Sequence, residues 1–332
     1  MKNVKILAIE SSCDETSVAI VENGSKVLSL SIATQMDIHA LYGGVVPEIA
    51  SRMHTEAINY VIDDALNKAQ LTLNDVDAIA VTYAPGLLGS LIVGVEAAKA
   101  LSLTTSKPLI AVNHLMGHIF ANNIDNELNY PLLALVVSGG HTETILMNSP
   151  YDLEVLGRTE DDAIGEAYDK VARVIGLDYP GGPNVEKYAL KGQPTYKLPQ
   201  PMNNDSLNFS FSGLKSAIVN LAYQEKIHNR PLNKENLARS FQDIAVKEIC
   251  QKVSLALQKT QAKYLIVAGG VSANKYLREE LINLAKSRNI DISIPKFIYC
   301  TDNAAMIGAA AYYKYLKQDF ADYSLNPTSI EE

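Results

Sequence analysis

Several features that mark other classes of protein are scarce or absent in these 332 residues. Only three cysteines occur, Cys13, Cys250 and Cys300, and none is paired as CxxC, which indicates a reducing compartment and no disulfide framework. No apolar run reaches the roughly 18–20 residues that a membrane span needs. The first ten residues, MKNVKILAIE, enter a strand-like run and have no feature of a signal or transit peptide. We therefore expect a cytoplasmic protein without a membrane segment.

Positive charge is also in deficit. The chain has 29 lysines and arginines against 37 aspartates and glutamates, which gives a formal net charge of −8. Such a chain is not dominated by general attraction to polyanions. A nucleic-acid partner would need help from another subunit or a local basic patch. The candidates for that patch are Lys187, Lys191, Lys197, Lys275 and Arg278.

Strand and helix patterns alternate along the first third of the chain. Residues 4–10 and 16–21 are β-branched runs joined by the polar turn SSCDE, which predicts a hairpin. The next elements expected are a helix at 47–69, a strand at 76–86, a helix at 87–103, a strand at 108–114 and a helix beginning near His114.

The pattern then restarts. Residues 131–147 superimpose on residues 5–21 at an offset of 126, so that Ser138 falls on Ser12. A second pair of segments, 77–95 and 263–281, matches in the same order as strand, glycine-containing loop and helix. Two matches in one order predict the duplication of an α/β unit.

The duplication predicts two lobes. The first would span residues 1–128 and be completed by a C-terminal helix at 303–320, and the second would span residues 129–302. Residues from about 178 to 215 are rich in Gly, Pro, Asn and Ser. We expect them to form a long loop inserted in the second lobe, and loops of this length are usually functional.

Three turns have the composition of nucleotide-binding loops. ESSCDETS ends a strand in hydroxyls and carboxylates, and VVSGGHTE ends one in glycines whose backbone N–H groups can approach a ligand. In VAGGVSANK, Gly269 and Gly270 lie between a strand and a helix, where a helix N-terminus can meet an anion. Together they predict two ribonuclease H-like α/β lobes of the sugar kinase, actin and heat-shock ATPase superfold.

Two of the six histidines, His114 and His118, are four residues apart in NHLMGH. On a helix they share one face, about 5–6 Å apart between Cβ atoms, and can bind one metal ion. Two solvated surface histidines would have the same spacing. The zinc-protease motif HExxH has it too, but Leu115 takes the place of its glutamate, which disfavours a protease. Asp302, at a strand-to-helix junction, is a candidate for a third ligand.

Eight segments together resemble one family. They are AIESSCDETSVAIV, YGGVVPEIASRMH, NHLMGH, VSGGHTE, GEAYDKVARVIGLDYPGGP, FSGLKSA, VAGGVSANKYLR and TDNAAMIG. These long, ordered motifs are similar to those of the universal tRNA threonylcarbamoyladenosine transferase family, in its bacterial branch, called TsaD and formerly Gcp. The resemblance runs from about residue 5 to residue 315.

The resemblance implies an acyltransferase of tRNA processing. The donor would be threonylcarbamoyl-adenylate. The acceptor would be the exocyclic amine of the adenosine 3′ of the anticodon, in tRNAs reading codons that begin with A, and AMP would leave. Two protein partners are implied, the shorter paralogue TsaB and the ATPase TsaE. A homodimer through the small-residue helix at 89–100 is an alternative to tight packing of that helix within its lobe.

The resemblance also implies the residues of the site. His114, His118 and Asp302 would bind one divalent ion, iron rather than zinc. The residues implied to contact substrate are Val136, Val137, Ser138, Gly139, Gly140, Asp169, Gly182, Glu186 and Asn274. For Asp169, an ion pair with Arg173 one helical turn later is the alternative.

The first turn offers candidates for proton transfer. Asp14 and Glu15 could take the proton that the attacking amine loses as the new bond forms, although both also suit a polar turn. Two other functions fit the superfold. A small-molecule kinase would need a Mg²⁺ site built mainly from oxygen ligands, whereas an imidazole pair favours a transition metal. A nucleotide-switched scaffold would have no evident use for a metal-bound histidine pair.

Overall fold

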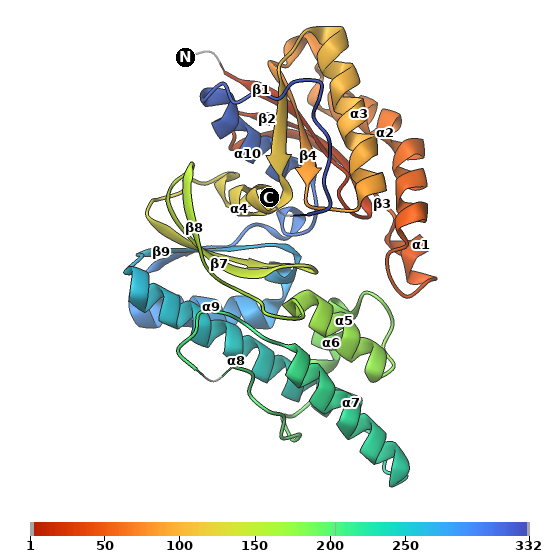
Figure 1. Ribbon diagram of the computed structural model, residues 1–332, viewed down its shortest axis with the longest axis vertical. Coiled ribbons are helices and arrows are strands. Elements are labelled where there is room, and N and C mark those ends of the chain that lie inside the picture. Colours follow the sequence, from red (N-terminus) through yellow and green to blue (C-terminus); the bar gives the residue numbers. More distant parts are fainter. Residues whose placement is uncertain (1–2, 203, 331–332) are drawn as a thin grey trace. The chain divides into compact units, whose positions relative to one another are not determined.

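Two five-stranded sheets, one in each of two compact units, form the frame of the computed structural model (Figure 1). The structure describes residues 3–202 and 204–330. Unit 1 comprises Met1–Leu128 and Pro295–Glu332, and unit 2 comprises Asn129–Ile294. Mixed sheets flanked by helices confirm the predicted α/β class.

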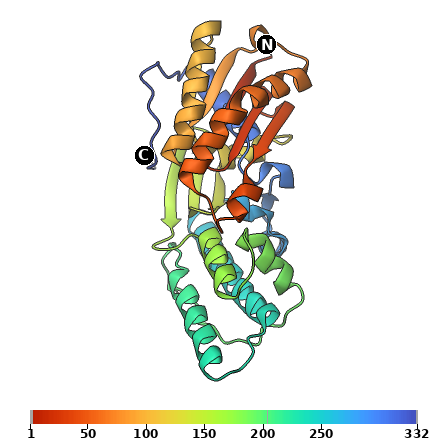
Figure 2. The ribbon, with the colours of Figure 1, turned by 90° about the vertical axis from the view of Figure 1, so that its right-hand side faces the viewer.

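In unit 1, helices cover both faces of a sheet with the order β3-β2-β1-β4-β5 (Figure 2). The strands are β1 (Lys5–Glu10), β2 (Glu15–Glu22), β3 (Lys26–Thr34), β4 (Ala78–Ala84) and β5 (Leu109–Asn113). The helices are α1 (Met36–Ala40), α2 (Pro47–Ala69), α3 (Leu88–Thr105), α4 (His114–Phe120) and α10 (Ala304–Leu316), with short 3₁₀ turns at Leu73–Asp75, Ala121–Asn123 and Phe297–Tyr299. The alternation of β1 separates the two faces, because Leu7 and Ile9 lie in the core shared with α2 and α3, whereas Ala8 faces α10.

Unit 2 repeats this arrangement with the order β10-β9-β6-β7-β8. Its strands are β6 (Leu132–Val137), β7 (Thr142–Ser149), β8 (Asp152–Arg158), β9 (Tyr264–Ala268) and β10 (Asp291–Ser293). Its helices are α5 (Ile164–Val174), α6 (Gly181–Ala189), α7 (Ser212–Ile227), α8 (Lys234–Thr260) and α9 (Lys275–Arg288), with a 3₁₀ turn, η3, at Gly270–Ala273. One core joins the inward side chains of β6 to α5, α6, α8 and α9.

The duplication predicted from the sequence is confirmed at the level of strand register. Adding 126 to both members of the β1–β2 pair Ile9↔Val18 gives Leu135↔Thr144, which is a pair of β6 and β7. Both hairpins are antiparallel and in the predicted alignment. The sequence offset therefore identifies structurally equivalent residues in the two units.

The parallel strand pairs agree with the second match predicted from the sequence. Residues 77–95 and 263–281 differ by 186 in number, and β1 pairs with β4 through Ile9↔Val81. Shifting Ile9 by 126 and Val81 by 186 gives Leu135↔Val267, which is a pair of β6 and β9. Both sequence matches thus describe one repeated α/β unit.

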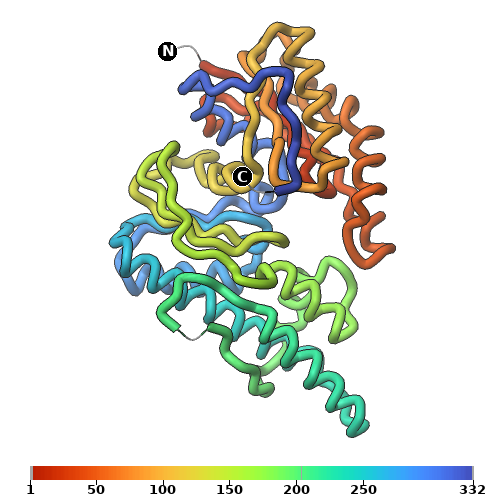
Figure 3. The backbone as a smooth tube through the Cα atoms, viewed as in Figure 1, coloured from red at the N-terminus to blue at the C-terminus, as the bar shows by residue number. Residues whose placement is uncertain are grey.

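The segment 178–215 is not the continuous loop that its composition predicted. Residues Gly181–Ala189 form α6, and α7 begins at Ser212. The Gly, Gly and Pro that indicated a loop occupy the first turn of α6, where proline is tolerated. Val185 and Ala189, one turn apart, are buried and hold the helix on the unit 2 core. Between α6 and α7, residues 190–202 and 204–211 lie outside the named helices and strands (Figure 3).

Helix α3 bears on the expectation that the chain has no membrane segment. It is 18 residues long and is apolar enough, by length and composition, to cross a membrane, although Glu96 and Lys99 interrupt the apolar residues. This pair forms an ion pair of 2.9 Å. A third of the helix is buried inside the fold, where it packs on α2 and β4. One such helix is weak evidence for a membrane segment, because core helices pass the same test.

Candidate metal centre and substrate-binding residues

The short helix α4 carries the histidine pair, and one asparagine starts it. Asn113 ends β5, and its side-chain oxygen accepts hydrogen bonds from the backbone N–H groups of Leu115 (2.8 Å) and Met116 (3.4 Å). This cap satisfies donors that the first turn leaves free. It places His114 at the first helical position and His118 one turn later on the same face.

Asp302 lies at the start of α10. Asn303 caps that helix by accepting a hydrogen bond from the backbone N–H of Met306 (3.1 Å). The N–H of Ala304 donates to the hydroxyl of Ser17 in β2 (3.0 Å). The start of α10, and with it the carboxylate of Asp302, is therefore held against the sheet.

Helices α4 and α10 approach each other closely at Gly117. A β-carbon at this position would lie 2.6 Å from Cδ1 of Ile307 and 3.2 Å from Cγ of Met306, both on α10. The first distance is shorter than real β-carbon contacts and the second is tighter than most, so a side chain here would force Ile307 and Met306 to shift. The glycine between the two histidines thus allows the close packing that brings His118 to Asp302.

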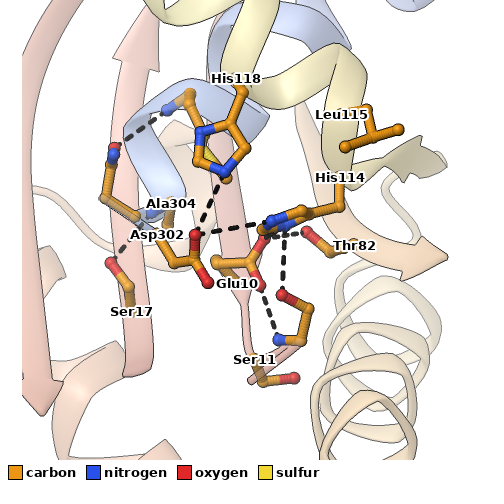
Figure 4. A network of polar contacts seen from close by, with 12 residues as sticks. Glu10, Ser11, Ser17, Thr82, His114, Leu115, His118, Asp302 and Ala304 are labelled. Carbon is orange, nitrogen blue, oxygen red and sulfur yellow. Dashed lines mark hydrogen bonds and ion pairs between the residues drawn. The ribbon is translucent and has the colours of Figure 1, made fainter. Parts of the chain in front are cut away.

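The three predicted metal ligands lie together in unit 1 (Figure 4). Oδ1 of Asp302 is 3.2 Å from Nε2 of His118 and 3.5 Å from Nε2 of His114. The two imidazole rings are nearly perpendicular, at 82°, with centroids 4.6 Å apart. Atoms that bind one ion tetrahedrally at about 2.0–2.1 Å lie about 3.3 Å from one another. The observed separations therefore suit a single ion.

The hydrogen bonding of His118 tests this fit independently. Its side chain is 1% exposed, and neither ring nitrogen makes a hydrogen bond within the described part of the chain. Its Nε2 lies 3.2 Å from Oδ1 of Asp302, an ion-pair contact. Because buried polar atoms nearly always have a partner, and imidazole and carboxylate are ligands of transition metals, these residues fit a divalent ion.

The electrostatics of the cluster support the same fit. Burial acts to lower the pKa of His114, but the charges of Asp302 and Glu10 outweigh it and raise that pKa to about 9. Burial acts to raise the pKa of Asp302, but His114 and His118 bring it down to about 2. Burial lowers the pKa of His118, which is therefore neutral. The metal-free cluster thus holds two carboxylates and one bound proton, and a divalent ion replacing that proton would balance its charge.

Glu10 is a member of the cluster that sequence reasoning missed. It ends β1 and is fully buried. Its Oε2 lies 3.2 Å from Nδ1 of His114 and accepts a hydrogen bond from the Thr82 hydroxyl (2.5 Å), while Oε1 accepts from the N–H of Ser12 (2.6 Å). Burial acts to raise the pKa of Glu10, but His114, by charge and hydrogen bond, lowers it overall. The signal in the sequence was a carboxylate ending the otherwise apolar run ILAIE.

Asp14 and Glu15, the predicted proton acceptors, lie where the turn after β1 leads into β2. Burial, followed by the charges of Asp302 and Asp14, raises the pKa of Glu15 to about 10. Glu15 is therefore protonated at neutral pH, and it is hydrogen-bonded to the Asp14 side chain.

A third histidine fixes this turn. His54, in the motif ASRMH of α2, is fully buried. Its Nε2 lies 3.0 Å from the carbonyl oxygen of Cys13, and its Nδ1 lies 2.7 Å from the hydroxyl of Thr16. Burial lowers its pKa, so the neutral ring donates to the carbonyl and accepts from the hydroxyl. His54 thereby ties α2 to both sides of the turn that carries Asp14 and Glu15.

In unit 2, the predicted substrate residues begin at the turn after β6. Val136 and Val137 are fully buried, backbone included, so neither presents any surface to a ligand in this structure. The turn is closed by hydrogen bonds between Ser138 and His141, from the N–H of Ser138 to the carbonyl of His141 (2.8 Å) and from the N–H of His141 to the serine hydroxyl (3.0 Å). Gly139 and Gly140 are exposed at its tip, and a β-carbon on either would meet nothing within 4 Å.

The turn is packed tightly from behind by α5. A β-carbon on Gly165 would lie 2.6 Å from the carbonyl oxygen of Ser138 and 2.8 Å from Cα of Gly139. The N–H of Gly165 also donates to that carbonyl (3.2 Å). The glycines at the tip are therefore open on the solvent side and supported by backbone on the other.

Asp169 and Gly182 meet at the start of α6. Oδ1 of Asp169 accepts a hydrogen bond from the N–H of Gly181 (2.8 Å), and the N–H of Gly182 also donates to the carboxylate. Burial nevertheless raises the pKa of Asp169. Arg173, the partner considered from the sequence, lowers the pKa of Asp169 through its charge, but by less than the two backbone hydrogen bonds do.

Glu186 and Asn274 meet at the start of α9. Oε1 of Glu186 accepts from the N–H of Lys275 (2.6 Å), and Oδ1 of Asn274 accepts from the N–H of Leu277 (2.8 Å). The amide of Asn274 donates to Gln242 (3.1 Å). The predicted substrate residues Asp169, Glu186 and Asn274 thus already hold helix N-termini, a structural task that their sequence motifs did not reveal.

Comparison with known proteins identifies the family. A family model described as tRNA N6-adenosine threonylcarbamoyltransferase, TsaD, matches residues 26–309. The curated tRNA N6-adenosine threonylcarbamoyltransferase of Staphylococcus aureus (strain Newman) is 50% identical over 326 residues, which cover 98% of this chain and 96% of that protein. The protein of the same name from Staphylococcus saprophyticus is 51% identical over 322 residues, which cover 97% and 94%.

Solved structures with low sequence identity share the fold. HypF in its phosphate- and nucleotide-bound form matches with a TM-score of 0.64 at 13% identity, over 94% of this chain and 46% of that one. Component A of the (R)-2-hydroxyglutaryl-CoA dehydratase of Acidaminococcus fermentans matches with a TM-score of 0.55 at 12% identity, over 94% and 99%. They support the predicted superfold of sugar kinases, actin and heat-shock ATPases.

The identities near 50% over almost the full length of the relatives decide between the functions that the superfold allows. They favour neither a small-molecule kinase nor a nucleotide-switched scaffold. The chain belongs to the tRNA N6-adenosine threonylcarbamoyltransferase family and is a transferase that modifies tRNA.

Proposed function

We propose that the protein transfers the threonylcarbamoyl group of threonylcarbamoyl-adenylate to the exocyclic amine of the adenosine 3′ of the anticodon, in tRNAs reading codons that begin with A. AMP is the leaving group. The observation that carries this proposal is the cluster of His114, His118 and Asp302, which presents ligands for a transition metal in a chain of this transferase family.

The residues of each unit suggest which step of the reaction that unit supports. In unit 1, His114, His118 and Asp302 hold one divalent ion, which we propose to be iron rather than zinc. When bound, the ion supplies a Lewis acid for an oxygen of the donor. Three protein ligands leave further coordination positions for that oxygen, as catalytic sites require.

Proton transfer falls to the turn after β1. The attacking amine is weakly nucleophilic and loses its proton as the N–C bond forms and the bond to the AMP oxygen breaks. Asp14 accepts the proton, and the neutral carboxyl of Glu15 donates a hydrogen bond that supports its charge. His54 holds the turn in place through Cys13 and Thr16.

In unit 2, backbone groups bind the adenylate. The amides of Gly139 and Gly140, at the open tip of their turn, donate to phosphate oxygens. Gly182 has open space above its Cα, which allows close approach of a nucleoside. Asp169, Glu186 and Asn274 contribute by fixing the helix starts around this surface and offer the ligand their remaining acceptor positions.

The tRNA requires cations that this acidic chain supplies sparingly. Lys187, Lys191 and Lys197 are exposed, and none makes an ion pair within the described residues. We propose that they contact tRNA phosphates. Arg278, another predicted candidate, is committed to the carbonyl of Ser272 (2.5 Å). Because these contacts are few, we propose that partners of the TsaB and TsaE type strengthen the binding of tRNA. The complex would act in the cytoplasm. A homodimer of this chain is the alternative assembly.

The experiment is a transfer assay with labelled threonylcarbamoyl-adenylate and unmodified tRNA, with and without the TsaB and TsaE proteins of the same cell. We expect label in the tRNA and an equal amount of AMP. A matched tRNA with guanosine in place of the target adenosine lacks the N6 amine and should stay unlabelled. Absence of labelled tRNA with all partners present would disprove the proposed reaction.

A further inference from the structure

We infer that Glu10 is a positioning residue of the metal centre, which holds the ring of His114 so that Nε2 faces the ion. The inference rests on the metal assignment of the proposed function. It concerns a residue that does not touch the ion, since the carboxylate of Glu10 lies on the Nδ1 side of His114 and Asp302 lies on the Nε2 side.

The contacts of Glu10 define an oriented acceptor. Its Oε2 takes the Nδ1 hydrogen of His114 at 3.2 Å, and the hydroxyl of Ser12 lies 3.1 Å from the same nitrogen. The carboxylate cannot rotate freely, because Thr82 donates to Oε2 and the N–H of Ser12 donates to Oε1. A hydrogen fixed on Nδ1 leaves the lone pair on Nε2, the atom that faces Asp302. Carboxylate–histidine–metal arrangements of this kind orient the ring and increase its basicity.

The duplicated unit shows that the fold itself does not need this carboxylate. The offset of 126 that relates β1 to β6 places Val136 at the position of Glu10. The offset of 186 that relates β4 to β9 places Ala268 at the position of Thr82. Val136 and Ala268 are fully buried and paired with each other in the parallel ladder of unit 2. The same strand ends therefore form with apolar side chains.

Burying the carboxylate of Glu10 costs free energy unless it is paired. A fully buried carboxylate is far less favourable than a valine at the same place unless it is hydrogen-bonded and paired. Unit 1 has Glu10 and Thr82, together with His114, where unit 2 has two apolar residues. The difference between the copies coincides with the contact between Glu10 and His114 in unit 1, which assigns Glu10 and Thr82 to the orientation of that ring.

The repeat also supplies the variant that tests the inference. Glu10→Val combined with Thr82→Ala reproduces in unit 1 the pair that unit 2 already folds with. The probe is Co²⁺, whose visible spectrum reports ligand number and geometry, together with Zn²⁺ affinity measured by competition with a chelator. We expect the double variant to remain folded, to bind Zn²⁺ about 10- to 100-fold more weakly, and to show a changed Co²⁺ spectrum.

Two further variants keep the test decisive. Glu10→Gln preserves the volume but sets an amide N–H₂ against a donor, either Nδ1 of His114 or the N–H of Ser12, so it should also weaken Zn²⁺ binding. Thr82→Ala alone leaves the carboxylate in place and should weaken it least. If the double variant unfolds, Glu10→Gln decides the matter.

The outcomes separate this inference from the proposed function. Folded Glu10 variants with wild-type Zn²⁺ affinity and Co²⁺ spectrum would overturn the role of Glu10 and leave the metal centre standing. Wild-type protein that bound neither ion would overturn the metal centre, and the inference with it.

Discussion

Strands β1 and β6 are the same strand in two copies, yet they end in different chemistry. Their hairpins share one register, so Glu10 and Val136 occupy equivalent positions. In unit 1 the strand ends in a buried carboxylate beside the cluster of His114, His118 and Asp302. In unit 2 it leads into a turn with an open Gly-Gly tip. We propose that the first copy acts through charged side chains and the second through backbone groups. The two copies thus share strand register and differ in the residues at the strand ends.

Buried glutamates sharpen the comparison. Glu10 and Glu248 are both fully buried. Glu10 has three hydrogen-bond partners and a lowered pKa, whereas both oxygens of Glu248 lack a hydrogen bond in the described chain and burial raises its pKa to about 7. Burial alone therefore does not set the ionisation of a carboxylate, and its partners do.

The largest effect is expected when unit 1 loses a metal ligand. His118→Ala should reduce the bound metal from one ion per chain to almost none and lower transfer by more than about 100-fold, because even partners of ligands cost 10- to 100-fold. The variant should stay folded, since His118 makes no hydrogen bond to a described residue. Metal analysis of the purified protein, with the transfer assay, provides the check.

The matched control is His141→Ala, the histidine of the equivalent turn in unit 2. If the metal belongs to unit 1 alone, this variant keeps its full complement. A His118→Ala protein with a full metal complement would show that the cluster is not the metal site.

Metal binding should also depend steeply on pH. The charges around His114 raise its pKa from 6.5 to about 9 in the metal-free protein, and only the neutral ring can bind an ion. Zn²⁺ affinity should therefore increase about tenfold per pH unit up to about pH 9, or about 100-fold between pH 7 and 9. Calorimetry in buffers of different ionisation enthalpy should detect one proton released per ion bound.

The same shift affects the stability of the metal-free protein in the opposite sense. A raised folded pKa means that the paired, protonated His114 stabilises the fold fully below pH 6.5, and that this contribution is lost as the pH rises through about 9. A Zn²⁺ affinity that stayed constant between pH 7 and 9 would contradict the assignment of the proton to His114.

Local patterns in the sequence predicted the fold better than they predicted the site. Helix α2 has the bounds that its periodicity indicated, 47–69, and the offset of 126 gave the register of two hairpins. Each of these depends on neighbours in the chain or on comparison of two segments. The spacing of His114 and His118 was equally local.

The missed residues are those whose role depends on distant partners. Glu10 meets Thr82, 72 residues away, and His54 meets Thr16, 38 residues away. No periodicity reports such contacts. The close approach at Gly117 likewise depends on α10, almost 200 residues later in the chain. In α6, the glycines and proline of a helix start have the composition of a loop, and the burial that decides between them is tertiary.

Two glycines at the unit 2 turn should respond in opposite ways. Gly140 has open space around it, so Gly140→Val should change the free energy of unfolding by less than about 0.5 kcal/mol. Its side chain would block the amides, and affinity for an adenine nucleotide should fall about 10- to 100-fold. Gly165→Ala should destabilise the protein by about 1–3 kcal/mol, because its β-carbon would meet backbone atoms at 2.6 and 2.8 Å.

Calorimetric titration and denaturant unfolding of both variants separate the two roles. Unchanged nucleotide affinity in a folded Gly140→Val protein would remove the turn from the binding surface. Equal stability of Gly165→Ala and wild type would show that the turn can move away from α5.

The smallest effect is expected from the buried glutamate of unit 2, and it should depend on pH. The Nζ of Lys252 lies 3.9 Å from Glu248 and donates instead to the carbonyls of Met202 and Ser206. The folded pKa of Glu248 is raised from 4.5 to about 7, so ionisation opposes folding and stability falls as the pH rises from 4.5 through 7. Glu248→Gln cannot ionise, and should be close to wild type at pH 5 and about 1 kcal/mol more stable at pH 8. The expected gain is less than the full pKa shift would give, because a buried amide without partners has its own desolvation cost.

Glu10→Gln is the matched control and should be less stable than wild type at pH 8, because it loses a paired carboxylate whose pKa is lowered. Urea unfolding of the three proteins at pH 5 and pH 8 provides the measurement. If Glu248→Gln and Glu10→Gln shifted the unfolding midpoint in the same direction at pH 8, partners would not be what distinguishes the two buried carboxylates.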